Sequence, residues 1–241
     1  NKSRVRTGYR RFYNNTVIRS VNIDGGTNWP MIAKDCRILN RADGSESNKY
    51  LRCTIGQDTF PTSKLYDYGL GRAQYIKCNI QNIYSLHNYM GNYYECKIKN
   101  MVGEFQKGST TTLFSNCELY NMKINILHDD NFIVTFNECI IKESTFDELQ
   151  QGIGVNISFI NCDINISTSL TKLRTCSLQK PMLFENNIIT GSSANGLINF
   201  YQDYSPPWGI VQQDNVTLKN NNITLYSSPY VIIGLTKNTL N

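Results

Sequence analysis

The amino-acid sequence predicts an all-β fold, a single-stranded right-handed parallel β-helix of roughly nine to ten coils. Two observations lead to this prediction, the residue composition and a motif that recurs along the chain. The 241 residues include 30 Asn and 26 Ile but only four Ala. Ala is the best helix former, whereas Ile favours strands and Asn favours turns. The composition therefore disfavours a helical bundle and a doubly wound α/β fold.

The recurring motif is an aromatic or aliphatic residue, two variable residues, Cys or Asn, one variable residue, and Ile or Leu. A clear copy is Phe159-Ile160-Asn161-Cys162-Asp163-Ile164. The copies are centred on Cys36, Cys53, Cys78, Cys96, Cys117, Cys139, Cys162, Asn187 and Asn221. The steps between these centres are 17, 25, 18, 21, 22, 23, 25 and 34 residues. A period of this length indicates a solenoid, with one motif in each coil.

The spacing inside the motif predicts which residues form the core. The Cys and the Ile two residues later share one side of a strand, because alternate residues point the same way. We expect both to point inward and to form columns, since parallel coils stack about 4.8 Å apart. Thiols stacked in this way are poorly oriented for disulfides, so the column from Cys53 to Cys162 is predicted to be buried and free.

A second column is predicted four residues after the centre of the motif, at Asn40, Asn82, Asn100 and Asn121. Asn tolerates left-handed backbone angles and can hydrogen-bond to a neighbouring turn. We therefore expect an asparagine ladder at a corner of the coil.

The repeated Phe-x-Asn-Cys-x-Ile strings resemble the pectin-lyase-like superfamily of right-handed parallel β-helices. They are most similar to the β-helical shafts of phage tailspikes and related virion appendages, over roughly residues 30–225. The resemblance implies a virion or extracellular protein that binds host cell-surface polysaccharide, and a homotrimer of side-by-side β-helices. Calcium and arginine motifs of the pectate-lyase type are not recognisable, so the resemblance does not extend to that chemistry.

The chain is expected to have three parts. Residues 1–30 form an N-terminal cap or connecting segment, residues 31–225 form the parallel β-helix, and residues 226–241 form a C-terminal capping strand. A solenoid has to cover its open ends, which is why capping segments are expected. No run of 18 apolar residues exists, so membrane insertion is not expected.

The net charge of +5 comes from the N-terminal segment. Six of the 24 basic residues lie in the first twenty positions, which leaves 18 basic against 19 acidic residues in the rest of the chain. This segment could contact nucleic acid or another acidic polymer, or it could be a solvated cap or connector. We favour the second interpretation and predict no nucleic-acid partner, because the aromatic and glycine signatures of nucleic-acid modules are missing.

One insertion suggests a binding loop. The last step of 34 residues is longer than one coil, and its surplus, residues 200–209, contains Tyr201, Tyr204 and Trp208. Insertions in solenoids emerge as loops on one face, often the binding face, and aromatic rings suit sugar stacking. We predict that these three residues bind substrate; the alternative is a lid or a contact with a sister subunit.

A pair of acids suggests a catalytic site. Glycoside hydrolysis needs two carboxyl groups, about 5–5.5 Å apart for retention and about 6.5–9.5 Å apart for inversion. The eighth residues after the motif centres of four successive coils are Leu86, Glu104, Asn125 and Asp147, and His87 follows Leu86. We predict Glu104 and Asp147 as catalytic acids two coils apart, with Asn125 and His87 as substrate-binding residues.

Two alternatives stay open. Glu118 and Asp163 form a second pair with the same offset on an outward face, and any of these acids could be a solvated surface residue. Whether the protein is an enzyme is left open, and a glycoside hydrolase is favoured over a lyase. The alternative function is a non-catalytic structural shaft or decoration module of a virion or cell-surface assembly.

No metal and no cofactor are predicted. The sequence has no CxxC motif and only two His residues, so it does not support a structural zinc site. P-loop and dinucleotide fingerprints are also absent from the sequence.

Overall fold

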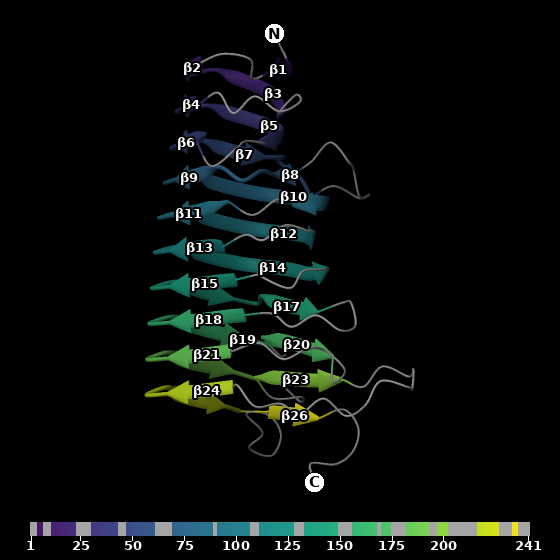
Figure 1. The fold of residues 1–241 in the computed structure, drawn as a ribbon, viewed down its shortest axis with the longest axis vertical. Coiled ribbons are helices and arrows are strands. Elements are labelled where there is room, and N and C mark those ends of the chain that lie inside the picture. Colours follow the sequence, from purple (N-terminus) through teal and green to yellow (C-terminus); the bar gives the residue numbers. More distant parts are fainter. Residues whose placement is uncertain are drawn as a thin grey trace.

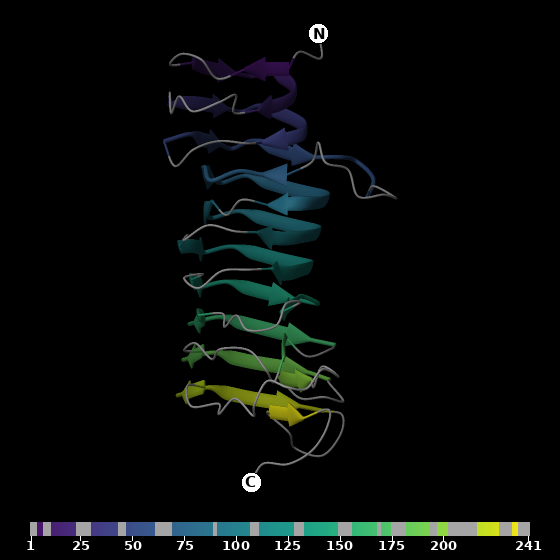
Figure 2. The same ribbon diagram turned by 45° about the vertical axis from the view of Figure 1, so that its right-hand side comes forward.

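The computed structural model is a parallel β-solenoid, which confirms the predicted all-β parallel β-helix (Figure 1). It describes residues 4–6, 11–22, 30–42, 47–60, 69–88, 91–106, 111–127, 133–148, 156–167, 170–174, 182–192, 197–201, 216–226 and 233–235. The strands lie across a long axis, one above another, so that the molecule is an elongated stack (Figure 2). Among these residues no helix is present, and hence none that could cross a membrane.

The first sheet has ten parallel strands and contains the residues that precede each motif centre. Its strands in spatial order are β2 (Arg11–Asn14), β4 (Met31–Lys34), β6 (Lys49–Leu51), β9 (Gln74–Ile76), β11 (Asn92–Tyr94), β13 (Thr111–Ser115), β15 (Ile133–Asn137), β18 (Asn156–Ile160), β21 (Met182–Glu185) and β24 (Val216–Lys219). The spatial order follows the sequence order, as expected when each coil contributes one strand.

The second sheet has sixteen strands and contains the residues that follow each motif centre. Its main path is β1 (Arg4–Arg6), β3 (Val17–Asn22), β5 (Arg37–Ala42), β7 (Thr54–Gly56), β10 (Asn79–Asn88), β12 (Lys97–Gln106), β14 (Glu118–Leu127), β16 (Ile140–Lys142), β19 (Asp163–Ile166), β22 (Ile188–Gly191) and β25 (Asn222–Leu225). Five strands lie off this path: β8 (Gly69–Leu70), β17 (Thr145–Glu148), β20 (Thr171–Arg174), β23 (Ile198–Tyr201) and β26 (Ile233–Leu235).

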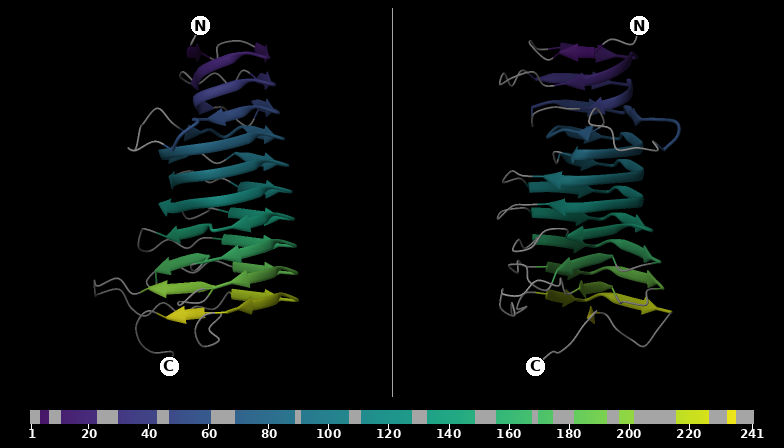
Figure 3. Two further views of the ribbon diagram at one scale, coloured as in Figure 1. Left: turned by 180° about the vertical axis from the view of Figure 1, so that it is seen from behind. Right: turned by 90° about the vertical axis from the view of Figure 1, so that its right-hand side faces the viewer.

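The second sheet changes into two separate runs of strands along the stack. Strands β10, β12 and β14 each have ten residues and pair along both of their halves. Below β14 the coil is divided, because β16 pairs with the first half of β14 and β17 pairs with its second half. We call the run formed by the second halves of β10, β12 and β14 with β17, β20, β23 and β26 the third face (Figure 3).

The solenoid includes strands from both predicted end segments. Strands β2 and β3, within residues 1–30, pair in parallel with β4 and β5 and so belong to the same stack. Strand β26, within residues 226–241, pairs in parallel with β23 as the next strand of the third face. The described parts of these segments therefore continue the coils.

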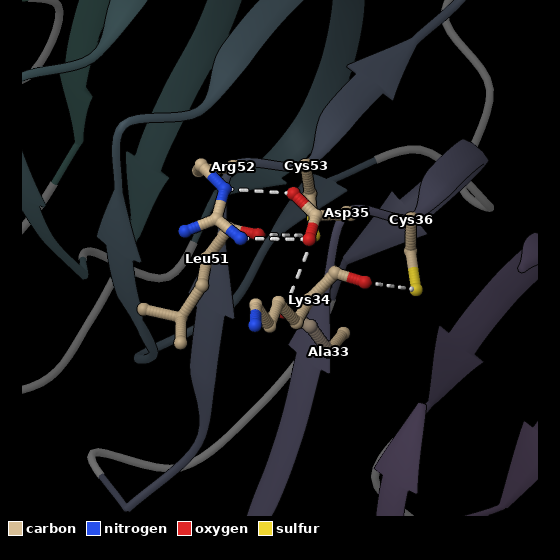
Figure 4. A network of polar contacts seen from close by, with 7 residues as sticks. All are labelled: Ala33, Lys34, Asp35, Cys36, Leu51, Arg52 and Cys53. Carbon is tan, nitrogen blue, oxygen red and sulfur yellow. Dashed lines mark hydrogen bonds and ion pairs between the residues drawn. The ribbon is translucent and has the colours of Figure 1, made fainter. Parts of the chain in front are cut away.

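A left-handed residue before each motif centre makes the corner between the first two sheets. Nine such residues have φ between 50° and 55°, namely Asp35, Arg52, Lys77, Glu95, Asn116, Glu138, Asn161, Asn186 and Asn220, and Asn15, with φ of 47°, has the equivalent place in the coil before the first motif. At the corner drawn in Figure 4, Arg52 donates its backbone N–H to the Ile76 carbonyl at 2.9 Å, and its guanidinium binds Asp35 at 2.7 and 2.8 Å. The bend lets the residue three places before the centre point inward, which simple strand alternation does not predict.

That extra inward position holds a stack of aromatic rings through the core. Neighbouring ring centroids are 4.6–5.1 Å apart and the planes differ by 4–18°. The rings belong to Tyr50, Tyr75, Tyr93, Phe114, Phe136, Phe159 and Phe184, all of them buried. Aromatic pairs contribute about 0.5–1.5 kcal/mol each beyond the burial of their area, so this stack stabilises the coil-to-coil contact throughout its length.

The predicted thiol column is confirmed. Seven cysteines are free and buried, Cys36, Cys53, Cys78, Cys96, Cys117, Cys139 and Cys162. Cys176 lies outside the described residues.

The predicted asparagine ladder is confirmed at three of its four positions. Asn100 donates its side-chain amide to the Asn82 Oδ1 at 2.9 Å, and Asn121 donates to the Asn100 Oδ1 at 2.9 Å. All three have φ between 52° and 54°. The inclusion of Asn40 was wrong, because its φ is not left-handed and the amide of Asn82 instead binds the carbonyl of Gln57 at 2.9 Å.

Candidate functional site

The third face places the predicted acid pair in one register. Glu104 of β12 lies opposite Asn125 of β14, and Asn125 lies opposite Asp147 of β17. The register therefore has the two acids two strands apart with the amide residue between them. Adjacent strands are about 4.8 Å apart, so the two backbone positions are separated by about 9.6 Å, close to the upper limit for carboxyl groups of inverting enzymes.

Buried residues fix the local backbone on which Asp147 and Asn125 stand. Phe146 immediately precedes Asp147, is 3% exposed, and contacts the rings of Phe136 and Phe159 at centroid distances of 4.8 and 5.8 Å. Ile124, which precedes Asn125, is also buried and lies in register with Phe146. Apolar anchors of this kind hold neighbouring positions in a set register, as a binding or catalytic site requires.

A buried serine fixes the bend that leads into β17. The Ser144 hydroxyl accepts a hydrogen bond from the Met122 N–H at 3.1 Å and donates one to the Lys142 carbonyl at 2.9 Å. The backbone N–H of Phe146 donates to the Leu170 carbonyl at 2.8 Å. These bonds tie the acid-bearing segment to the coils above and below it.

The column of the acid pair continues below Asp147. Asp147 lies opposite Lys172 of β20, and Lys172 lies opposite Asn199 of β23. Sequence reasoning missed both residues because Lys172 is ten positions after Cys162, whereas Asp147 is eight positions after Cys139. A rule that allowed extra residues at the corner, rather than a constant offset of eight, would have found them.

The other predicted binding residues are only partly placed by the structure. His87 belongs to β10, where the register with β12 shifts between Ser85 and Asn88, so the strand pairing does not set it opposite Glu104. Tyr201 ends β23 opposite Arg174 of β20. Tyr204 and Trp208 lie outside the described residues, so the predicted binding loop stays a prediction.

The second acid pair has the same spacing on a different face. Glu118 lies opposite Ile140, and Ile140 lies opposite Asp163. Glu118 is exposed and forms an ion pair with Lys97, with 2.9 Å between the carboxylate oxygen and the ammonium nitrogen. A partnered surface acid of this kind fits the solvated interpretation, and this pair therefore serves best as a matched control for Glu104 and Asp147.

Two thiols of the buried column, Cys96 and Cys139, are unsuited to nucleophilic chemistry, whereas hydrogen bonds from neighbouring thiols lower the pKa of Cys78 and Cys117 to about 4. Hydrogen bonds with the neighbouring thiols Cys117 and Cys78, together with burial, raise the pKa of Cys96. The same contacts with Cys117 and Cys162 raise the pKa of Cys139. A neutral thiol in an apolar interior is a poor nucleophile and a poor metal ligand. In the described part of the chain, no group of three or more His, Cys, Asp or Glu could hold a metal ion.

Comparison with known proteins finds no relative of this chain: no family model matches it, and neither the curated proteins nor the solved structures include a match.

Proposed function

We propose that this chain is a β-helical appendage module of the tailspike type, in the pectin-lyase-like superfamily, and that it binds and cleaves host-surface polysaccharide outside the cell or on a virion. The observation that carries the proposal is the register that aligns Glu104, Asn125 and Asp147 on the third face. It supports the proposal because inverting glycosidases use two carboxyl groups held this far apart around a water molecule.

The neighbouring strands suggest which acid has which role. Asp147 lies in register between Asn125 and Lys172, so a basic residue occupies the next strand. We assign Asp147 as the base that activates water and Glu104 as the acid that protonates the leaving oxygen. Asn125, between them, would hydrogen-bond the sugar at the scissile bond.

The test is a depolymerisation assay on capsular and cell-wall polysaccharides, with new reducing ends as the readout. Glu104→Gln and Asp147→Asn should each abolish turnover while the melting temperature changes little. Glu118→Gln and Asp163→Asn are the matched controls, since they remove a pair of equal spacing on another face. The assignment is contradicted if both site variants still depolymerise the polysaccharide. It is also contradicted if the control variants lose turnover to the same extent as the site variants.

A non-catalytic shaft is the second candidate, and the uninterrupted columns of the core favour it. The aromatic stack and the thiol column pass the level of Glu104 and Asp147 without a break, as a rigid rod requires. This candidate predicts no new reducing ends, and no ultraviolet-absorbing unsaturated products, with any glycan in the same assay.

Self-association is proposed through the outer surface of the first sheet. From β9 to β18 its outward, partly exposed residues carry no charge, namely Gln74, Ile76, Asn92, Tyr94, Thr111, Leu113, Ser115, Ile133, Thr135, Asn137, Asn156, Ser158 and Ile160. An uncharged surface with Ile76, Leu113, Ile133 and Ile160 among polar residues suits a contact between copies, and the resemblance to tailspikes suggests a trimer. Analytical ultracentrifugation should detect a trimer, and Ile76→Lys combined with Ile160→Lys should convert it to monomer; a wild-type monomer contradicts the proposal.

A further inference from the structure

One outward column of the second sheet combines two lysines with an exposed tyrosine. Lys99 of β12 lies opposite Tyr120 of β14, and Tyr120 lies opposite Lys142 of β16. Tyr120 is 45% exposed. The Lys99 ammonium lies 5.5 Å from the centroid of the Tyr120 ring. The three residues therefore place an exposed aromatic ring between two lysines on the surface, with the ammonium of Lys99 over the ring.

The column extends on both sides with residues that form hydrogen bonds but carry no charge. Gln81 lies opposite Lys99, Asn165 lies opposite Lys142, and Thr190 follows Asn165. Asn165 already donates its amide to the Thr190 hydroxyl at 3.0 Å, which orients both side chains. We call these six residues, from Gln81 to Thr190 in one register, the lysine–tyrosine column. It contains two cations and no acid.

The adjacent outward column differs because its charges neutralise one another. There Lys97 lies beside Glu118, with 2.9 Å between the ammonium and the carboxylate. In the part of the chain that the structure describes, no carboxylate forms an ion pair with Lys99 or Lys142. The uncompensated positive charge of this face therefore lies along the lysine–tyrosine column.

We propose that the lysine–tyrosine column is a binding site for an acidic polysaccharide that lies along the axis of the solenoid. A sugar ring stacks on Tyr120, because aromatic rings offer an apolar face to the C–H groups of a pyranose. Lys99 and Lys142, two strands apart at about 9.6 Å, bind carboxylate groups on either side of that sugar. Gln81, Asn165 and Thr190 supply hydrogen bonds to hydroxyl groups of the following sugars.

This inference shares with the proposed function only the class of ligand, a polysaccharide. The site lies on the second sheet, whereas Glu104 and Asp147 lie on the third face. Binding is therefore measured with the Glu104→Gln/Asp147→Asn double variant, which leaves the column intact and removes the proposed turnover. Loss of turnover and loss of binding are then separate results.

The experiment is isothermal titration calorimetry of the full chain with oligogalacturonate and, as the neutral comparison, the same oligomer with its carboxylates methyl-esterified. We expect the acidic oligomer to bind and the ester to bind at least tenfold more weakly. Lys99→Gln and Lys142→Gln should each weaken binding about fivefold, in keeping with exposed charge pairs, and raised salt should weaken it further. Tyr120→Ala should abolish it, whereas Tyr120→Phe should retain it.

The matched control is Lys97→Gln, which removes another exposed lysine, from the neighbouring column. It should leave the dissociation constant within about twofold, because Glu118 already compensates that charge. An equal loss in Lys97→Gln and Lys99→Gln would show unspecific attraction to a basic surface and overturn the proposal. Absence of binding, or equal binding of the acid and its ester, would also overturn it.

Discussion

The coils centred on cysteines and the coils centred on Asn187 and Asn221 use different residues at the same inward position. Cys78 and Cys139 donate their S–H to the carbonyl of the aromatic residue in the coil above, Tyr50 and Phe114, at 3.2 and 3.4 Å. In the same position Asn187 donates its side-chain amide to the Phe159 carbonyl at 2.9 Å. The column therefore changes residue type without changing the bond that it makes.

The acceptor side of the column is seen at Asn187. Its Oδ1 receives the backbone N–H of Cys162 at 2.8 Å, and its amide also donates to the Asn221 Oδ1 at 2.9 Å. Both residue types thus bind the aromatic carbonyl of the coil above, and Asn adds a bond from a backbone N–H and a bond along the column. The cysteines are therefore small core residues that also form hydrogen bonds between neighbouring coils.

The largest expected effect comes from removing an asparagine from this column. Asn187→Ala leaves the Cys162 N–H and the Phe159 carbonyl without their side-chain partner in a buried site, whereas the Asn221 Oδ1 keeps the backbone N–H of residue 187 as its donor. We expect a loss of about 3–5 kcal/mol in the free energy of unfolding, measured by urea denaturation. Asn187→Cys restores the residue used in the coils above, and it should recover more than half of the loss. Equal destabilisation by Ala and Cys would contradict the equivalence.

Removing a thiol should cost less. Cys117→Ala loses the S–H bond to the Tyr93 carbonyl, which is 3.5 Å long, and leaves a small cavity in the column. We expect a loss of about 1–2 kcal/mol by the same measurement. Cys117→Ser keeps a donor and an acceptor of similar size and should be closer to wild type. A loss as large as that of Asn187→Ala would show that the thiol bond is stronger than its length indicates.

The ladder at the second corner can be extended by one substitution. Glu143 has φ of 52° and follows Asn121 in the ladder, although Glu is poorly suited to a left-handed backbone. Glu143→Asn should increase the free energy of unfolding by about 0.5–1 kcal/mol, because Asn tolerates this backbone and can continue the amide chain. Asn100→Ala, which breaks the ladder between Asn82 and Asn121, should decrease it. A stability unchanged in both variants would mean that the ladder contributes nothing.

The smallest effect on stability is expected from the exposed ion pair between Asp35 and Arg52, at the corner that precedes the motif centres. A hydrogen bond from Arg52 lowers the pKa of Asp35 below 3.8, its value without partners. The pair therefore stabilises the fold above pH 4 and loses that contribution as the pH falls through the lowered pKa of the folded state. NMR titration of the Asp35 carboxylate should give a pKa below 3.8 that returns toward 3.8 in Arg52→Gln. An equal pKa in the two proteins would contradict the interaction.

The prediction of the core was accurate in successive coils that carry the motif without inserted residues between its positions. Residue alternation around Cys78, Cys96 and Cys117 was enough to predict the buried column, since each coil meets the next at a fixed strand spacing. The register of Glu104, Asn125 and Asp147 also followed from a constant offset. The offset failed for Lys172 because two further residues precede it in its coil.

Some features of the candidate sites depend on contacts between coils. Tyr120 was not singled out in the sequence, because its exposure and the position of Lys99 beside it depend on the pairing of β12 with β14. The neutralisation of Lys97 by Glu118 depends on the same pairing.

The sequence by itself determined that the chain is a parallel solenoid, which residues form its buried thiol column, and where an asparagine ladder forms. These features repeat within one coil, so local spacing encodes them. Only the tertiary structure decided that the aromatic residues also stack inside, that the second sheet divides below β14, and which surface charges remain uncompensated. The reason is that these depend on the left-handed corners and on the register between coils, where residues about 20 positions apart in sequence become neighbours.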